Sequence, residues 1–417
     1  MKKITMKNLN YFRRVVTFLI LVLFLIFSAC NEEALTDDSV DATFSETDGV
    51  GLSSDISSGG TRGGSSDGQG IGGDNSGLVT AGEWNDLENW IFWNDILNEN
   101  EYFKNKEYWG FYSNNRISVQ INNNNVPLVN AKVEIRLNNE FVWKSMTDNF
   151  GKTELYIGLF NVDNQIVLEN YKLYINDIEN TTSLKFFDSG IVEIQLNSEV
   201  NNSSNKVEIA FIVDATGSMG DELEFLKDDL KDVIQRSEQN NSALDIFTGT
   251  VFYRDINDDY LVKSSGFTNN IDTTLEYIKS QYASGGGDYP EAVNSALNEA
   301  LTQLQWSLNS KTRIAFLLLD APPHHNSQIV EELHDLVTLS AEKGIKIIPV
   351  TASGIDKETE FLMRFFSVST NGTYVFITND SGIGNDHIEA SVGEYEVENL
   401  NDLLVRLINK YSSDSSN

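Results

Sequence analysis

Hydrophobic and polar positions first alternate with a period of two. Between residues 115 and 200, Ile117, Val119 and Ile121 point to one face while polar residues occupy the places between them. This alternation is typical of half-buried strands. Asn-rich turns such as residues 122–125 separate the apolar runs. The pattern predicts a small all-β sandwich over residues 115–200.

From about residue 206 the pattern changes to apolar runs that alternate with helical stripes. The nearly unbroken apolar run 207–213 is typical of a central parallel strand. Further strands are predicted at 314–319, 345–350 and 374–377, with helices after residue 220, after residue 292, around 329–339 and at 400–411. Strand–helix alternation of this kind predicts a doubly wound, mostly parallel α/β domain over residues 206–412. Ligands of such domains bind beyond the carboxyl ends of the strands.

The N-terminus predicts a secretion signal. Basic residues precede the apolar run Val15–Phe27. That run has about 13 residues, whereas a membrane helix needs about 20, so residues 1–29 are predicted to be a signal peptide. The segment Ser28-Ala29-Cys30 resembles a lipobox, which implies cleavage before Cys30 and its lipidation. The alternative is an ordinary cleaved signal with an incidental cysteine.

The next residues indicate where the chain resides. Glu32 and Glu33 resemble the export signals of Bacteroidota surface lipoproteins. That resemblance implies a lipid-anchored protein of the bacterial outer membrane, exposed at the surface. A periplasmic orientation is the alternative. Residues 30–79 are rich in Ser, Gly and Asp and poor in aromatic residues, which predicts a disordered tether.

Residues 80–114 are crowded with aromatic side chains, among them Trp84, Trp90 and Trp93. Such a cluster could bind sugar or peptide, or it could be a packing module that caps the next domain. The sandwich that follows resembles the transthyretin-like partner domain of carboxypeptidases around the turn 147–153. That resemblance implies an accessory or spacer role.

Charge and cysteine content exclude several classes of protein. The formal net charge is −32, with 62 acidic residues. So acidic a chain repels nucleic-acid phosphates and anionic lipid surfaces. Cys30 is the only cysteine, so no disulfide can form within the chain.

The first α/β strand is followed by Asp214-Ala215-Thr216-Gly217-Ser218-Met219-Gly220. This run resembles the metal-ion-dependent adhesion site of von Willebrand factor A (vWA) domains, Asp-x-Ser-x-Ser, in its hemicentin-like form. Asp214, Thr216 and Ser218 on a tight turn can direct three oxygens to one point, and Mg²⁺ prefers six oxygen ligands. The alternative is that Asp214 only caps the following helix.

Two further segments fall in the order that the resemblance implies. Residues 285–292 contain Asp288-Tyr289-Pro290-Glu291, similar to the Asp-x-Pro-Glu segment of integrin β subunits. The similarity implies Glu291 as a ligand of the main ion and Asp288 at an adjacent Ca²⁺ site. Thr268 is the alternative to Glu291. Asp320, at the end of a central strand, matches the last acidic ligand of the family.

The resemblance implies a binding protein and not an enzyme. Mg²⁺ or Mn²⁺ held by this site would bind an acidic side chain of a protein partner. One alternative is a structural component of a surface complex, in which the metal only stabilises the fold. A metal-assisted hydrolase is the remaining alternative, although no positioned base accompanies Thr216 and Ser218. His324 and His325 are either metal-binding or titrating groups, or they line a loop.

Overall fold

The computed structural model describes residues 79–162, 165–198, 204–378 and 388–413. The chain divides into two compact units, residues 1–70 and 71–417, and all described residues belong to the second. The predicted signal peptide, Cys30 and the tether up to residue 78 lie outside the described residues. Within the described part of the chain, no helix is both long and apolar enough to span a bilayer.

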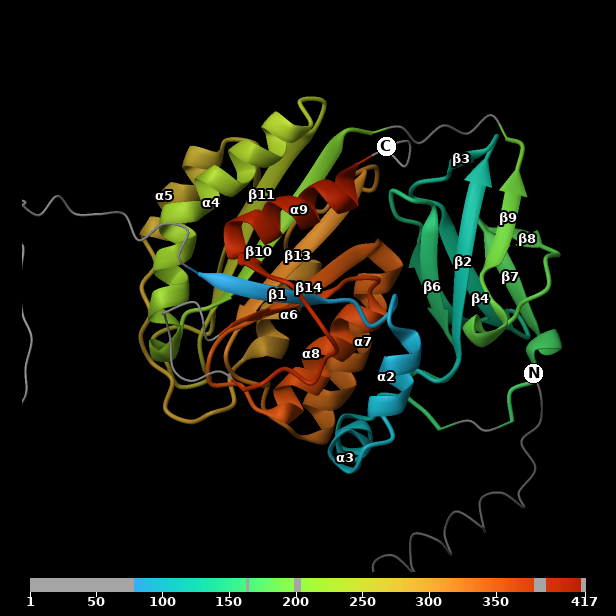
Figure 1. Ribbon diagram of the computed structural model, residues 1–417, viewed down its shortest axis with the longest axis horizontal. Coiled ribbons are helices and arrows are strands. Elements are labelled where there is room, and N and C mark those ends of the chain that lie inside the picture. Colours follow the sequence, from blue (N-terminus) through green and yellow to red (C-terminus); the bar gives the residue numbers. More distant parts are fainter. Residues whose placement is uncertain (1–78, 163–164, 199–203, 379–387, 414–417) are drawn as a thin grey trace, which may run out of the picture. The chain divides into compact units, whose positions relative to one another are not determined.

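An eight-stranded sheet forms the centre of the α/β domain, in the order β12-β11-β10-β13-β14-β15-β1-β16 (Figure 1). The five central strands, β11, β10, β13, β14 and β15, are parallel to one another. The outer strands β12, β1 and β16 pair antiparallel with their neighbours. The predicted doubly wound, mostly parallel fold is therefore confirmed. The strands are β1 (Thr80–Trp84), β10 (Lys206–Asp214), β11 (Asp245–Tyr253), β12 (Val262–Thr268), β13 (Thr312–Leu319), β14 (Ile345–Thr351), β15 (Tyr374–Ile377) and β16 (Val397–Asn399).

Helices cover both faces of this sheet. Alternate residues of β10 enter two different cores: Ile209 and Phe211 pack with α4, α5 and α9, whereas Ala210 and Ile212 pack with α6, α7 and α8. Burial on both faces explains why the strand is an unbroken apolar run. The helices are α4 (Gly220–Asn240), α5 (Ile271–Lys279), α6 (Val293–Thr302), α7 (Ser327–Lys343), α8 (Lys357–Ser369) and α9 (Leu400–Ser412).

The aromatic segment 80–114 is built into the α/β domain. Its strand β1 lies between β15 and β16, and the helices α2 (Trp90–Ile96) and α3 (Asn100–Trp109) follow. Trp93 is fully buried and its ring lies near Phe361 and Phe365 of α8, with centroid separations of 6.3 Å and 6.2 Å. Most large aromatic side chains of the segment are thus core residues and not an open binding surface.

A buried ion pair fastens this segment to α8, and its loss should destabilise the domain. Arg364 donates from Nε and Nη2 to the Asp86 carboxylate at 2.9 Å and 2.6 Å, and both side chains are almost fully buried. Asp86→Ala leaves the guanidinium without that partner, so we expect the free energy of unfolding to fall by about 3–5 kcal/mol. Glu88→Ala is the matched control, because Glu88 is 65% exposed and pairs with Lys410 at the surface. Urea unfolding measures both variants, and equal small losses would contradict this assignment.

The predicted β-sandwich region consists of two four-stranded sheets. One has the order β3-β2-β6 with β9 added to β2, and the other has the order β5-β4-β7-β8. Ile117, Val119 and Ile121 of β2 are fully buried, as the period of two predicts. The strands are β2 (Arg116–Asn123), β3 (Val126–Pro127), β4 (Lys132–Leu137), β5 (Glu140–Met146), β6 (Lys152–Tyr156), β7 (Tyr171–Ile175), β8 (Ile178–Asn180) and β9 (Val192–Leu196).

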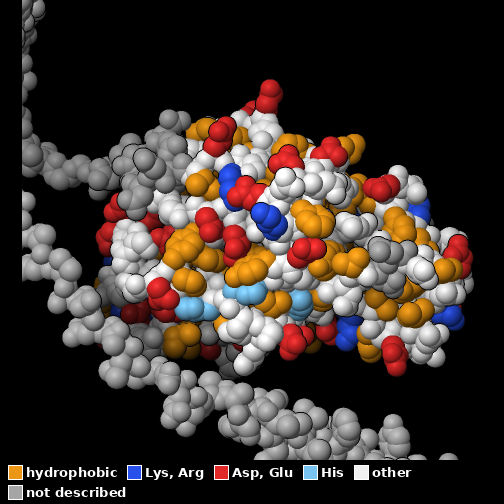
Figure 2. Space-filling view, turned by 90° about the horizontal axis from the view of Figure 1, so that it is seen from below, with side chains coloured by type: hydrophobic (Ala, Val, Ile, Leu, Met, Phe, Trp, Pro, Cys, Tyr) orange, Lys and Arg blue, Asp and Glu red, His pale blue; other side chains and the backbone are white. Residues whose placement is uncertain are grey.

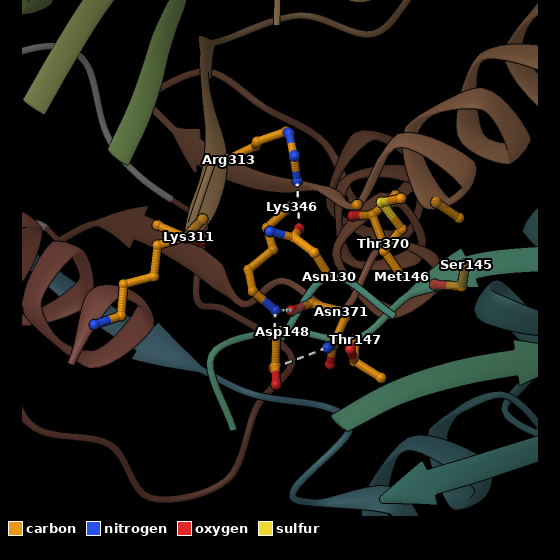
Figure 3. A pocket seen from close by; sticks show the side chains of 13 residues that line it. Asn130, Ser145, Met146, Thr147, Asp148, Lys311, Arg313, Lys346, Thr370 and Asn371 are labelled. Atoms are coloured by element: carbon orange, nitrogen blue, oxygen red, sulfur yellow. Dashed lines mark hydrogen bonds and ion pairs between the residues drawn. The ribbon is translucent and has the colours of Figure 1, made fainter. Parts of the chain in front are cut away.

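Polar contacts join the sandwich to the amino ends of the parallel strands. Lys346 at the start of β14 donates to the Asp148 carboxylate at 3.2 Å, and Asn371 donates to the same carboxylate at 3.1 Å (Figure 3). Arg313 at the start of β13 donates to Asn130 at 3.0 Å. These contacts lie at the amino end of the sheet and leave its carboxyl end, where β10 and β13 finish, free for a site.

Candidate functional site

The loop after β10 is folded around Asp214. Asp214 is fully buried, and its Oδ1 accepts hydrogen bonds from the Thr216 amide at 2.9 Å and the Thr216 hydroxyl at 2.7 Å. The Thr216 and Ser218 hydroxyls are 3.5 Å apart. Asp214 does not cap α4, whose N-cap residue is Met219 without a side-chain cap bond. The second carboxylate oxygen, Oδ2, is buried and has no hydrogen-bond partner among the described residues, although the Asp214 charge acts on the buried Tyr253.

A glycine-rich loop brings Glu291 to the same place. The Gly217 amide donates to the Gly285 carbonyl at 3.1 Å, which joins the two loops. A Cβ atom added at Gly286 would lie 3.1 Å from both Glu291 Oε1 and Thr216 Cβ. Glu291 and Thr216 therefore converge across Gly286. The residue Glu291 is only 3% exposed, and its Oε2 has no hydrogen-bond partner.

Two further carboxylates face this point. Asp320 follows β13 and is 7% exposed, and burial raises the pKa of its carboxyl. Its charge acts on both Asp214 and Glu291. Glu222, in the first turn of α4, is 3% exposed, with Oε2 unpartnered and Asp320 among the charges that act on it. We did not predict Glu222 from the sequence. Its place two residues into the helix after the Asp214 loop is the signal that could have identified it.

Burial and mutual repulsion make these carboxylates difficult to ionise. Burial and the nearby Asp320 charge raise the pKa of Asp214 to about 7. Burial, followed by the charges of Asp214 and Asp255, raises the pKa of Glu291 to about 9. Burial also raises the pKa of Glu222 to about 7. Desolvated like charges of this kind are stable when a cation lies among them.

The donor set fits a hard divalent cation. Carboxylate and hydroxyl oxygens converge, two of the buried carboxylate oxygens lack any other partner, and Ser218 is exposed so that one side stays open. Mg²⁺ prefers such oxygen ligands and usually retains water. The residues that would hold the ion, directly or through water, are Asp214, Thr216, Ser218, Glu291 and Asp320. They are the five residues predicted from the sequence. The contacts described above join Asp214, Thr216, Ser218 and Glu291, and Asp320 acts on Asp214 and Glu291 through its charge.

A second cluster lies on the loops beside this site. Asp255, Asp288 and His324 place one ligand atom each within 4.8 Å of one another, an arrangement consistent with a divalent metal site. His324 Nε2 lies 2.7 Å from Asp255 Oδ1. The described histidines gather on one face among hydrophobic and acidic side chains (Figure 2). His325 is engaged elsewhere, because its ring stacks on Tyr108 at 3.5 Å.

Thr268 is not near the site. It ends β12, which runs antiparallel to β11, and it pairs with Thr248 near the start of β11. Asp214, in contrast, pairs with Tyr253 at the carboxyl end of β11. Thr268 therefore lies toward the amino ends of the parallel strands, away from Asp214. Of the two alternative ligands, Glu291 is the one that lies near Thr216.

The β11–β12 loop holds the two site loops together. Arg254, which is 1% exposed, donates to the Ala215 carbonyl at 3.1 Å and to the Tyr282 carbonyl at 2.7 Å. Asp258 accepts from the Asp255 amide at 3.1 Å and from the Gly286 amide at 3.0 Å. We did not predict these two positioning residues, because their role depends on loops that are far apart in the sequence.

The glycine-rich loop offers a test of this geometry. Gly286 has a φ of +74°, and a methyl group there would press on Glu291 and Thr216. We expect Gly286→Ala to cost about 1–3 kcal/mol of stability and to weaken Mg²⁺ binding about tenfold or more. Gly287→Ala is the control, since a Cβ there meets nothing within 4 Å. Calorimetric Mg²⁺ titration measures the effect, and equal affinity in the two variants would refute the convergence at Gly286.

Most of the α/β domain matches a known family of domains. Residues 208–382 match the family model described as the von Willebrand factor A domain. This part of the chain is a vWA domain. The matched range begins in β10 and contains every residue of both clusters. Domains of the vWA family are generally protein-interaction modules. The Asp255, Asp288 and His324 cluster is consistent with an interaction that depends on a metal ion.

Two proteins match segments of this chain. Over 121 residues the chain is 38% identical to an ariadne-like RING finger protein of Acanthamoeba polyphaga mimivirus. This match covers 29% of this chain and 12% of that protein. Over 134 residues the chain is 32% identical to the alpha-protein kinase vwkA of Dictyostelium discoideum. This match covers 32% of this chain and 21% of that protein. The chain thus matches only a small part of these relatives' lengths.

Among solved structures, the chain is similar to the conserved hypothetical protein BatB of Bacteroides thetaiotaomicron. The match has 17% sequence identity and a TM-score of 0.33, and it covers 50% of this chain and 98% of that one.

Proposed function

We propose that this protein is a lipid-anchored binding protein of the bacterial cell envelope, whose vWA domain grips an acidic side chain of a protein partner through Mg²⁺ or Mn²⁺. The observation that carries the proposal is the convergence of Asp214, Thr216 and Glu291 at the carboxyl end of the sheet. Buried oxygens of Asp214 and Glu291 have no hydrogen-bond partner within the part of the chain that the structure describes. The basic and apolar N-terminus with Cys30 supports the lipid anchor, and Glu32 with Glu33 supports exposure on the outer membrane.

The residues of the site suit reversible binding of a carboxylate. When bound, the cation supplies a Lewis acid for the partner's oxygen. Thr216 is held by Asp214 and offers a neutral oxygen, so it takes little positive charge from the ion. Ser218 is exposed and marks the side from which a partner can approach. The surrounding carboxylates repel an acidic partner in the absence of the ion, so binding should depend steeply on metal.

We propose a binding role and not catalysis for the two hydroxyl residues. The Thr216 hydroxyl donates to Asp214 at 2.7 Å and lies 3.5 Å from the Ser218 hydroxyl. Asp214 thus holds the Thr216 oxygen beside that of Ser218, and hydroxyl oxygens placed in this way suit a hard cation. Hydrolysis by the purified protein that disappears in Asp214→Ala would overturn this assignment.

The test is a capture experiment on intact cells with the full chain. In Mg²⁺ the wild-type protein should retain a specific partner, and excess EDTA should release it. Thr216→Ala should retain at least about tenfold less, whereas Thr268→Ala, whose residue lies away from the site, should behave as wild type. Equal partner retention by wild type and Thr216→Ala would contradict the proposal. Equal retention by wild type in Mg²⁺ and in EDTA would contradict it as well.

A structural role is the second candidate, favoured by the raised pKa values of Asp214 and Glu291. If the ion serves only to neutralise these carboxylates, its removal lowers the melting temperature and leaves partner retention intact. The capture experiment combined with thermal unfolding separates the two roles.

A further inference from the structure

We propose that Asp255, Asp288 and His324 form a second cation site that selects a late first-row transition ion, with Zn²⁺ as the preferred occupant. This site is separate from the Mg²⁺ site and does not depend on partner binding. It also revises the Ca²⁺ that the integrin resemblance implied for Asp288.

The three side chains come from three different loops at the same end of the sheet. Asp255 follows β11, Asp288 lies in the glycine-rich loop, and His324 follows β13. Their ligand atoms all lie within 4.8 Å of one another, so small side-chain movements would bring them around one ion. Asp255 is 6% exposed and forms a buried wall, while Asp288 is exposed. The cluster is therefore closed on one side and open to solvent on the other.

The nitrogen ligand determines the class of ion. Ca²⁺ and Mg²⁺ are bound by oxygen, whereas imidazole suits Zn²⁺, Cu²⁺ and Ni²⁺. Zn²⁺ binds both His nitrogen and Asp oxygen, and its open sites have three protein ligands with water in the fourth place. His324 Nε2 and Asp255 Oδ1 share a hydrogen bond of 2.7 Å. A transition ion would displace the proton between them and bind both atoms.

The second cluster is supported from behind, because the Asp258 carboxylate accepts from both the Asp255 amide and the Gly286 amide. Such supporting hydrogen bonds are a regular feature of metal sites.

The test is equilibrium dialysis of the full chain against Zn²⁺ in excess Mg²⁺, which fills the first site. Wild type should bind about one Zn²⁺ per chain, and His324→Gln and Asp288→Asn should each weaken binding about tenfold or more. His325→Gln is the matched control, because that ring stacks on Tyr108 and is not in the cluster. Circular dichroism verifies that each variant is folded, and Asp288→Asn, at an exposed position, keeps the test decisive if His324→Gln does not fold.

Co²⁺ provides an independent readout, since its visible absorption reports a tetrahedral site with a nitrogen ligand. The band should appear in wild type and in Thr216→Ala, and it should be absent in His324→Gln. Retention of Zn²⁺ by His324→Gln, loss of Zn²⁺ in His325→Gln, or displacement of Zn²⁺ by equimolar Ca²⁺ would each overturn the proposal. Since Thr216→Ala removes only the first site, failure of this proposal is distinguishable from failure of the proposed function.

Discussion

Asp214→Asn is expected to stabilise the metal-free protein while it removes Mg²⁺ binding. The Asp214 carboxylate is fully buried, and this burial together with the Asp320 charge raises its pKa to about 7. At pH 8 it is ionised at a cost to the fold. Asn has the same shape and still accepts a hydrogen bond from the Thr216 amide. We therefore expect the free energy of unfolding without metal to rise by roughly 1–3 kcal/mol, and the Mg²⁺ affinity to fall about 100-fold or more.

Urea unfolding at pH 8, in chelator and in Mg²⁺, measures both halves of this prediction. Wild type should gain stability from Mg²⁺, and Asp214→Asn should not. Asp228→Asn is a suitable control, because Asp228 is an exposed residue of α4 away from the converging loops. A metal-free Asp214→Asn protein that is less stable than wild type, with an unchanged response to Mg²⁺, would show that Asp214 is only a structural residue of the turn.

The metal-free protein should lose stability as the pH rises from about 4.5 to about 9. The pKa values of Asp214 and Glu222 are raised to about 7, and that of Glu291 is raised to about 9, each chiefly by burial. Across this range the folded state holds protons that the unfolded chain has already released. Their stabilising contribution is complete below the ordinary carboxyl pKa and is lost as the pH passes through the raised values. Each group contributes a slope of up to about 1.4 kcal/mol per pH unit.

Mg²⁺ should reverse this trend, because the ion binds the ionised carboxylates and competes with protons. Unfolding free energies measured at pH 5, 7 and 9 in metal-free buffer should decline, and the gain from added Mg²⁺ should increase over the same series. A metal-free protein whose stability is flat or rises between pH 5 and pH 9 would contradict the buried, repelling carboxylates.

The sequence predicted those parts of the fold whose signals are local. The apolar runs of β10, β13 and β14 and the stripes of α4, α7 and α9 are each readable within one segment. We did not predict β11 or α8 as separate elements. In β11, Thr248, Gly249 and Thr250 interrupt the apolar run, although Thr248 and Thr250 are buried. The pairing of β1 with β15 joins Trp84 to Tyr374, a contact between distant segments that no local pattern reveals.

The same distinction applies to the two clusters. Asp214, Thr216 and Ser218 lie within one turn, so their spacing alone indicated a common point. Asp255 and His324 are separated by 69 positions and meet only because β11 and β13 flank β10 with their carboxyl ends at one edge. Spacing could therefore identify the first cluster, whereas the second required the fold.

Calorimetric titration of Mg²⁺ into the full chain measures whether the converging oxygens hold an ion. We expect about one Mg²⁺ bound per wild-type chain, and no detectable binding by Thr216→Ala or by Glu291→Gln in folded protein. Glu291→Gln keeps the size of the side chain, so a loss of binding there reports the missing carboxylate charge. Equal Mg²⁺ binding by wild type and both variants would show that these converging oxygens do not hold the ion.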